Sequence, residues 1–155
     1  MGGRHGSITQ IEIHGDQVRA EVQMYATDAC ALPTFKLTYH GHVTIRQVSA
    51  GTFSFDQTAE SLILTPQADD VVAQYNLPGD HGCGLKGWER NVPKSVMGQR
   101  CGLFMFPTRG TTLYDMVWTD ADTLRFGQFP LAWSNVTVDS RPAQPLPQIY
   151  RRSDD

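Results

Sequence analysis

Alternation of apolar and polar residues with a period of two runs through much of this chain, and it predicts β-strands. The longest example is 35–45, in which the odd-numbered positions from Phe35 to Ile45 are apolar or aromatic apart from one glycine, and the even-numbered positions are polar. An alternation kept over this length is typical of a strand with one face on a core. Gly41, in the middle of the apolar face, predicts a bend in the strand.

Other segments supply partners for that strand. Shorter runs predict a hairpin of 8–14 with 17–26, a strand pair at 52–56 and 61–65, a strand at 103–106 that a proline ends, and a hairpin of 111–118 with 123–127. One short helix is predicted after Thr65, which would be its N-cap, with Pro66 in the first helical position. Acidic residues at 69 and 70 suit the positive end of the helix dipole. The expected fold class is all-β and antiparallel, with one short helix.

Composition narrows the classes of function. At 155 residues the chain is expected to form one domain, 1–155, around a single core. A formal net charge of −3 without a basic stripe disfavours a nucleic-acid partner. No run approaches the ~18 apolar residues of a membrane span, and the N-terminus lacks the apolar core of a signal peptide, so as written the chain is expected to be cytoplasmic. The sequence has no phosphate loop, Ser-His-Asp signature or metal quartet, and no cofactor or metal is expected.

Two of the three cysteines, Cys83 and Cys101, bracket a loop of 17 residues that is rich in glycine and contains Trp88. A disulfide there would contribute about 3 kcal/mol in the chain-entropy account. The alternative is a pair of buried thiols, since the disulfide requires an oxidising compartment. A metal or redox motif is disfavoured because no Cys-x-x-Cys pair is present.

Asp115 is the candidate general acid or base. It shares a strand face with Leu113 and Val117, and if that face is interior, desolvation should raise the pKa of its carboxyl. The other register places the face that begins with Tyr114 inside and turns Asp115 outward. His40 and His42 share a face at a spacing that suits a metal, but their polar neighbours favour a solvated outer face.

Two C-terminal features have alternative interpretations. Asn135-Val-Thr137 matches the acceptor pattern for glycosylation, which matters only for a secreted chain. The tail, 141–155, is rich in proline, and we expect it to lie across the mouth of a barrel or, less favoured, to be a polyproline ligand for a partner.

A set of short motifs occurs in a characteristic order over 8–149. The motifs are Thr27-Asp-Ala-Cys30, Pro33-Thr-Phe35, Gly41, Leu64-Thr-Pro66, Cys83-Gly, Gly87-Trp88, Cys101, Phe126-Gly-Gln128, Arg141-Pro142 and Pro145-Leu146. In order and spacing they resemble the domain of the adenomatosis polyposis coli down-regulated protein family, extracellular inhibitors of Wnt and BMP signalling. The resemblance implies a lipocalin-like β-barrel or half-barrel whose hydrophobic cavity accepts a lipid acyl chain, and a pairing of Cys83 with Cys101.

The chain departs from the family pattern in several respects. The pattern begins with an upstream tryptophan and a Cys-Glu segment, whose cysteine pairs with the equivalent of Cys30, and neither occurs here. The opening strand of the barrel is therefore expected to be missing or replaced. The animal proteins also carry two such domains, a signal peptide and a membrane anchor. We expect the fold and the cavity of the family to be kept in this chain, but not its role in Wnt signalling. The resemblance implies an extracellular location, whereas the N-terminus as written predicts a cytoplasmic one.

Three functions follow from this sequence. The first is binding of a hydrophobic small molecule or lipid acyl chain inside the barrel. Its expected lining is Phe35, Leu37, Tyr39, Val43, Phe53, Phe55, Leu103, Met105 and Leu113. The second is a small β-barrel enzyme, a cyclase or isomerase acting on a hydrophobic substrate with Asp115 or Tyr39 as its acid or base. The third is a protein-interaction domain that uses the tail or a strand edge.

Overall fold

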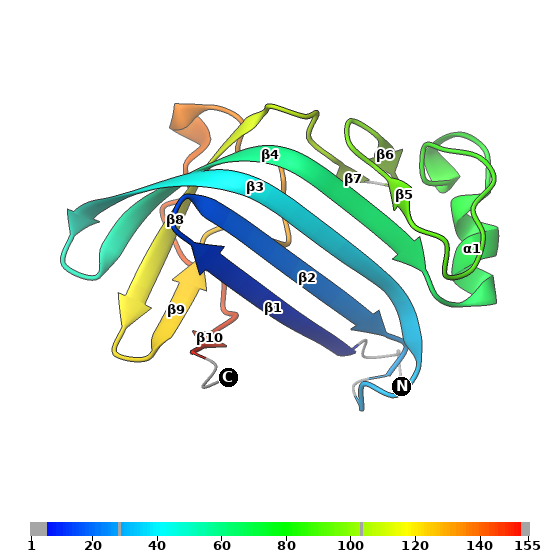
Figure 1. Cartoon of the computed structure of the whole chain (residues 1–155), viewed down its shortest axis with the longest axis horizontal. Coiled ribbons are helices and arrows are strands. Elements are labelled where there is room, and N and C mark those ends of the chain that lie inside the picture. The colour runs from blue at the N-terminus through cyan, green and yellow to red at the C-terminus, as the bar shows by residue number, and fades with distance from the viewer. Residues whose placement is uncertain (1–5, 28, 103, 153–155) are drawn as a thin grey trace.

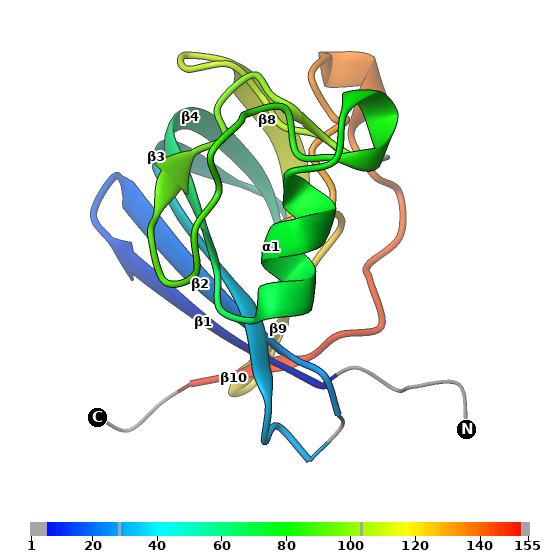
Figure 2. The same ribbon diagram turned by 90° about the vertical axis from the view of Figure 1, so that its right-hand side faces the viewer.

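The structure is a computed structural model that describes residues 6–27, 29–102 and 104–152. Its main feature is a curled antiparallel sheet, eight-stranded in the described residues, with the order β1-β2-β3-β4-β8-β9-β10 and with β5 beside one half of β4 (Figure 1). The main strands are β1 (Gly6–His14), β2 (Gln17–Tyr25), β3 (Pro33–Ser49), β4 (Thr52–Pro66), β8 (Thr112–Asp120), β9 (Thr123–Phe126) and β10 (Tyr150–Arg151). The sheet curls into a half-barrel, so the expected all-β fold class is confirmed (Figure 2).

The first four strands form a meander that the alternation predicts well. β1 and β2 pair from Gly6–Tyr25 to His14–Gln17, and β2 continues onto β3. The predicted strand pair at 52–56 and 61–65 is wrong, because β4 is one continuous strand. Gln57 and Ala59 in its middle point into the core, which keeps the strand's alternation where the sequence looks like a polar turn.

A β-bulge lies at the middle of the β3–β4 pair. Gly41 faces Ala59 while His40 faces Ser61, which leaves Glu60 as the extra residue on β4. A side chain at Gly41 would collide with the hydroxyl of Tyr39, and its Cβ would lie 2.7 Å from the carbonyl oxygen of Thr58. The glycine that predicts a bend therefore sits at the irregularity, where bulges bend and twist a sheet.

The segment between β4 and β8 lies across one end of the curled sheet (Figures 1 and 2). It contains α1 (Asp69–Tyr75), η1 (Gly79–His81), β5 (Lys94–Ser95), β6 (Arg100–Cys101) and β7 (Phe104–Met105). The helix exists, but its predicted start is wrong: Thr65 and Pro66 belong to β4, and the N-cap is Ala68, without a side-chain cap.

The predicted strand at 103–106 is also different in the structure. Phe104 and Met105 form β7, which pairs only with β6 in a separate two-stranded sheet, and Leu103 lies outside the described residues. This hairpin does not extend the half-barrel. The disulfide between Cys83 and Cys101 is present and joins it to the chain just after η1.

The chain after β9 packs back on the sheet. Asn135 continues along the edge of β8, where the backbone N–H of Tyr114 donates to its carbonyl oxygen at 2.8 Å. After η2 (Val138–Ser140), the N–H of Leu146 donates to the carbonyl oxygen of Phe126 at 2.8 Å, and β10 pairs with β9. The tail therefore follows the last strands of the sheet.

The core lies on the concave face of the sheet. Its largest members are aromatic: Tyr39, Phe55, Tyr75, Trp88, Phe106, Phe126, Phe129 and Trp133. Their rings pack edge to face or tilted, for example Tyr39 against Phe129 at 5.2 Å between ring centroids and Phe55 against Phe126 at 5.3 Å. The concave side is thus filled by side chains from both the strands and the segment after β9.

Candidate functional site

An apolar pocket opens where the β6–β7 hairpin meets the segment after β9. Its volume is about 680 Å³. The lining residues are Gly98, Phe104, Met105, Phe106, Pro107, Thr108, Thr111, Ala132, Trp133, Ser134 and Val136. Pockets of 300–1,000 Å³ with mostly apolar walls are typical of small-molecule sites.

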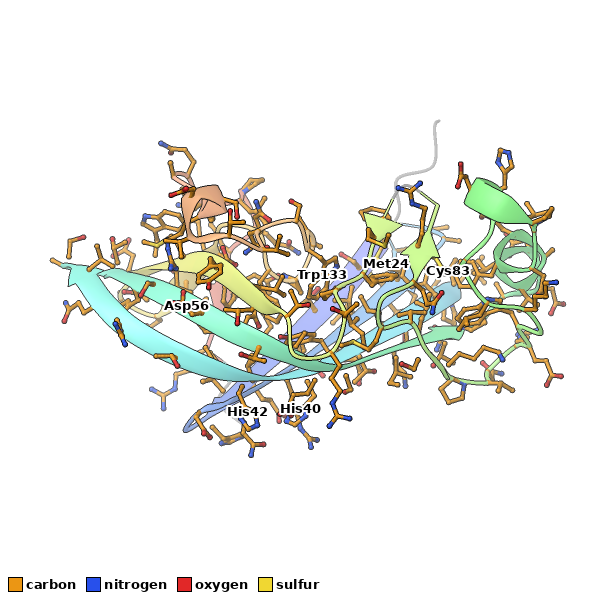
Figure 3. The ribbon with its side chains drawn as sticks, turned by 90° about the horizontal axis from the view of Figure 1, so that it is seen from above. Met24, His40, His42, Asp56, Cys83 and Trp133 are labelled. Atoms are coloured by element: carbon orange, nitrogen blue, oxygen red, sulfur yellow. A yellow bond between two sulfur atoms is a disulfide. The ribbon has the colours of Figure 1, made fainter. Side chains whose placement is uncertain are left out.

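Trp133 forms the wall of the pocket that faces the core. It is 7% exposed, and its ring lies 5.4 Å from that of Tyr39 and 6.0 Å from that of Phe129, the latter nearly perpendicular. Phe106 packs against it from the other wall at 6.4 Å. Trp133 lies on the concave side of the sheet, whereas His40 and His42 point away from the convex side (Figure 3). The pocket is therefore an extension of the aromatic core that reaches solvent.

The pocket mouth exposes large apolar side chains. Phe104 is 59% exposed, Met105 56% and Val136 49%. Such side chains are costly to leave in water when they gather in one place, and gathered groups mark binding sites more often than scattered ones do. The backbone on this side is fixed, because the N–H of Gly98 donates to Pro107 and the N–H of Phe106 to Gln99.

The predicted lining residues fall into three groups. The five buried ones, at 9% exposure or less, are Leu37, Tyr39, Val43, Phe55 and Leu113. Phe35 and Phe53 are half-buried and pack against the same core. Met105 lines the pocket, and Leu103 lies outside the described residues. The strands thus bring most of the predicted residues together as the aromatic core beneath the pocket, and Met105 is the predicted residue that lines the pocket itself.

Asp115 is fully buried, in the interior register of the two that the sequence allows. Its Oδ1 accepts hydrogen bonds from the backbone N–H groups of Met116 at 2.8 Å and Gln128 at 3.0 Å, and its Oδ2 accepts one from Phe129 at 2.8 Å. A buried carboxylate with three backbone donors is satisfied in place. Asp115 therefore anchors the turn that follows β9.

The pKa values of the two candidate acid or base groups are both shifted. Burial raises the pKa of Asp115 above its ordinary value, and the backbone N–H groups of Phe129, Met116, Gln128 and Gly127 oppose that shift. Burial, with a smaller contribution from Glu60, raises the pKa of the Tyr39 phenol. The Tyr39 hydroxyl is buried and makes no hydrogen bond within the described part of the chain. Neither residue lines the pocket.

His40 and His42 lie on the outer face, as their neighbours predict. Both imidazoles contact the Glu60 carboxylate at the β-bulge, through His40 Nδ1 at 3.3 Å and His42 Nε2 at 2.6 Å. Asp16 approaches His42 at 3.9 Å. Over residues 6–27, 29–102 and 104–152, no group of three metal-binding side chains is arranged to hold an ion.

The glycosylation pattern at Asn135 is not accessible in this fold. Asn135 is 2% exposed, and its side-chain amide donates to the carbonyl oxygen of Tyr114 at 2.8 Å. An amide held in this way connects the segment after β9 to the edge of β8. We conclude that the motif has a structural role.

The pocket residues that the sequence did not identify come from irregular segments. Trp133 and Val136 follow β9 in a stretch without alternation, so nothing in the pattern places them beside Phe104. The one sequence signal for the pocket is the run of apolar residues at 103–106. This run has the pattern of a barrel strand, so it predicts a strand rather than a pocket wall.

Comparison with models of protein families found no match, and comparison with curated proteins found none either. None of the helices in the described part of the chain has the length and apolar character needed to cross a membrane.

Proposed function

We propose that this chain binds a hydrophobic small molecule or a lipid acyl chain, and that the ligand enters the pocket beside Trp133. The observation that carries this proposal is the gathering of exposed apolar side chains, Phe104, Met105 and Val136, around an apolar pocket of about 680 Å³. The resemblance to a lipid-binding family leads to the same class of ligand. The proposal moves the site from the barrel interior, where the aromatic core lies, to the solvent-facing end of that core.

Apolar burial alone can supply the affinity. Each methylene removed from water contributes about 0.8 kcal/mol, so about ten methylenes contribute roughly 8 kcal/mol before association costs. A long chain would also cover the exposed side chains at the pocket mouth, which adds protein surface to the buried area. Few polar contacts are needed for such a ligand.

The enzyme alternative has less support. Asp115 is held by backbone donors at the turn after β9, and Tyr39 lies behind the ring of Trp133. Hydrogen bonding therefore explains the Asp115 carboxyl and packing the Tyr39 ring, and neither side chain lines the pocket. The interaction-domain alternative loses one of its two candidate contacts, since the tail packs on the chain's own β9.

A charged substitution at the pocket mouth tests the proposed site. Met105→Glu should lower the affinity for a long-chain fatty alcohol about tenfold or more, because a carboxylate would have to be desolvated by the chain. Titration with alcohols of increasing length, followed by native mass spectrometry, measures both the affinity and the depth of the pocket. The native protein should bind more tightly as the chain lengthens and then reach a plateau.

The matched control is Val48→Glu, at a residue of β3 that is 62% exposed and does not line the pocket. It adds the same charge and should leave affinity within about twofold. Equal losses in the two variants, or a native protein that binds no alcohol of any length, would contradict the proposed function.

A further inference from the structure

The two segments that form the pocket have an uneven distribution of charge. The first, 98–111, contains two arginines and no acidic residue, and the second, 132–136, contains no charged residue. This differs from the whole chain, whose formal net charge is −3. Arg100 and Arg109 are therefore the charged residues that these two segments contribute beside the pocket.

The two arginines differ in their partners. Arg100 Nη1 lies 3.7 Å from Asp80 Oδ1, so an acidic group of η1 already faces it. Arg109 is exposed, and within the described part of the chain it forms no ion pair. It stands between Thr108 and Thr111, which both line the pocket. Of these two arginines, Arg109 is thus the one without an ion pair in the described residues, and its sequence neighbour Thr108 lines the pocket.

The loop that carries Arg109 is well fixed. The N–H of Gly110 donates to the carbonyl oxygen of Ala59 at 2.8 Å, and the N–H of Thr111 to that of Thr108 at 3.1 Å. The hydroxyls of Thr108 and Thr111 lie 2.8 Å apart. A fixed loop holds the base of the arginine at the rim, so that ordering it on a ligand requires only side-chain rotations.

We infer that the ligand of this pocket is an amphiphile with an anionic head group, whose head is bound by Arg109 at the rim while its chain lies against Trp133. This inference rests on the proposed function and adds the chemical class of the ligand. A guanidinium binds a carboxylate or a phosphate through charge-assisted, often bidentate, hydrogen bonds. The hydroxyls of Thr108 and Thr111 add neutral hydrogen-bonding groups beside it.

The test compares ligands that share one chain and differ in the head. Hexadecanoate, hexadecyl phosphate and hexadecan-1-ol are titrated below their aggregation limits at about pH 8, where a carboxylic acid is ionised. At least one anion should bind the native protein about five- to tenfold more tightly than the alcohol. Whichever anion is preferred then identifies the head group as a carboxylate, a phosphate or either.

Arg109→Gln should reduce that preference to about twofold or less, because it weakens binding of the anion much more than binding of the uncharged alcohol. The control is Arg125→Gln, which removes the same charge at an exposed position of β9 outside the pocket and should keep the preference. Equal affinity of the native protein for the alcohol and both anions would overturn the inference while the proposed function stands. Equal effects of the two substitutions would also overturn it, whereas a failure of all three ligands to bind would remove both proposals.

Discussion

Asp115 illustrates how burial and hydrogen bonding act on one residue. Its carboxyl lies in the core, and burial raises its pKa above the ordinary value of 3.8 although backbone donors oppose that shift. A folded-state pKa above the unfolded one means that folding favours the protonated form. The stability due to this group is therefore complete below about pH 4 and is lost as the pH rises through the folded-state pKa.

The change Asp115→Asn tests this account. An asparagine keeps the oxygen that corresponds to Oδ1 and places an NH₂ group at the position of Oδ2. The buried backbone N–H of Phe129, which donates to Oδ2 in the native protein, then has no acceptor. The free energy of unfolding should fall by about 1–3 kcal/mol near pH 4. The difference from the native protein should narrow as the pH rises, because only the native protein carries the titrating group. Urea unfolding at a series of pH values measures it.

The control is Asp122→Asn, at an exposed position, which should change stability by less than about 0.5 kcal/mol. A difference between the native protein and Asp115→Asn that stays constant with pH would contradict the raised pKa. Ligand affinity is a second measurement: a binding protein should keep it nearly unchanged in this variant.

Individual residues show where sequence reasoning was sufficient. The placement of Tyr39 on an interior face and of His40 on the outer face follows from strand alternation, which fixes the side on which each residue lies. The partners of Asp115 could not be predicted, since Gln128 and Phe129 reach it through a turn whose path depends on the whole fold. The sequence predicts a bend at Gly41. It does not predict that a side chain there would collide with the Tyr39 hydroxyl, because that depends on the packing of the folded sheet.

At the scale of elements, continuous alternation was predictable and irregular connections were not. The hairpin of β1 and β2 and that of β8 and β9 match the predicted segments within a few residues. The sequence pattern predicts two strands where β4 is one, because Gln57 is polar and yet buried. The predicted start of the helix is wrong because Thr65-Pro66 is a good local N-cap signal. In the structure, pairing with Lys36 and Phe35 of β3 keeps both residues in the sheet.

The disulfide connects two elements that share no β-ladder with each other. Cys101 lies in β6, and Cys83, which is fully buried, follows η1 (Figure 3). The N–H of Gly102 also donates to the carbonyl oxygen of Gly82 at 3.0 Å. This connection holds one wall of the pocket to the helical end of the sheet.

Removing the disulfide should therefore affect both stability and binding. The double variant Cys83→Ala/Cys101→Ala should lose about 3 kcal/mol of unfolding free energy, from the loop that the bond closes. Its ligand affinity should also fall, because Met105 and Phe104 sit on the released hairpin. Chemical denaturation with and without reductant measures the effect on stability. Reductant should lower the unfolding free energy of the native protein by a similar amount and should not change that of the variant. A native protein that does not respond to reductant would argue against the disulfide.

On the scale of the whole molecule, the half-barrel is completed by the C-terminal tail. The Tyr150 ring packs on Phe126 of β9 at 5.7 Å between centroids. Burial raises the pKa of the Tyr150 phenol, which agrees with the packing of its ring on the core. The pairing order places β1 and β10 at opposite edges of the sheet, and no ladder of the described residues joins them. The proline-rich pattern predicts an extended tail, but it gives no information about the packing of Tyr150 on Phe126.

Arg141 connects the tail to β4 and β8, and its removal tests whether the tail stabilises the sheet. Its Nη1 donates to Asp56 Oδ1 at 2.6 Å and to the carbonyl oxygen of Asp115 at 2.8 Å, and its guanidinium lies 5.4 Å from the Tyr114 ring centroid. Because the guanidinium is only partly exposed, Arg141→Ala should lower the free energy of unfolding by about 1–3 kcal/mol. This is more than the loss expected when a fully exposed ion pair is removed.

Arg141→Lys should recover part of that loss, since an ammonium keeps the charge but not the planar guanidinium that lies over the Tyr114 ring. Denaturation of Arg141→Ala, Asp56→Ala and the double variant gives the coupling energy between the two side chains. A coupling near zero, with Arg141→Ala no worse than Arg125→Ala on the exposed face of β9, would mean that the tail lies on the sheet without stabilising it. A clear coupling would instead make residues after 140 part of the folded unit, so that deleting them would unfold the protein rather than simply remove a binding segment.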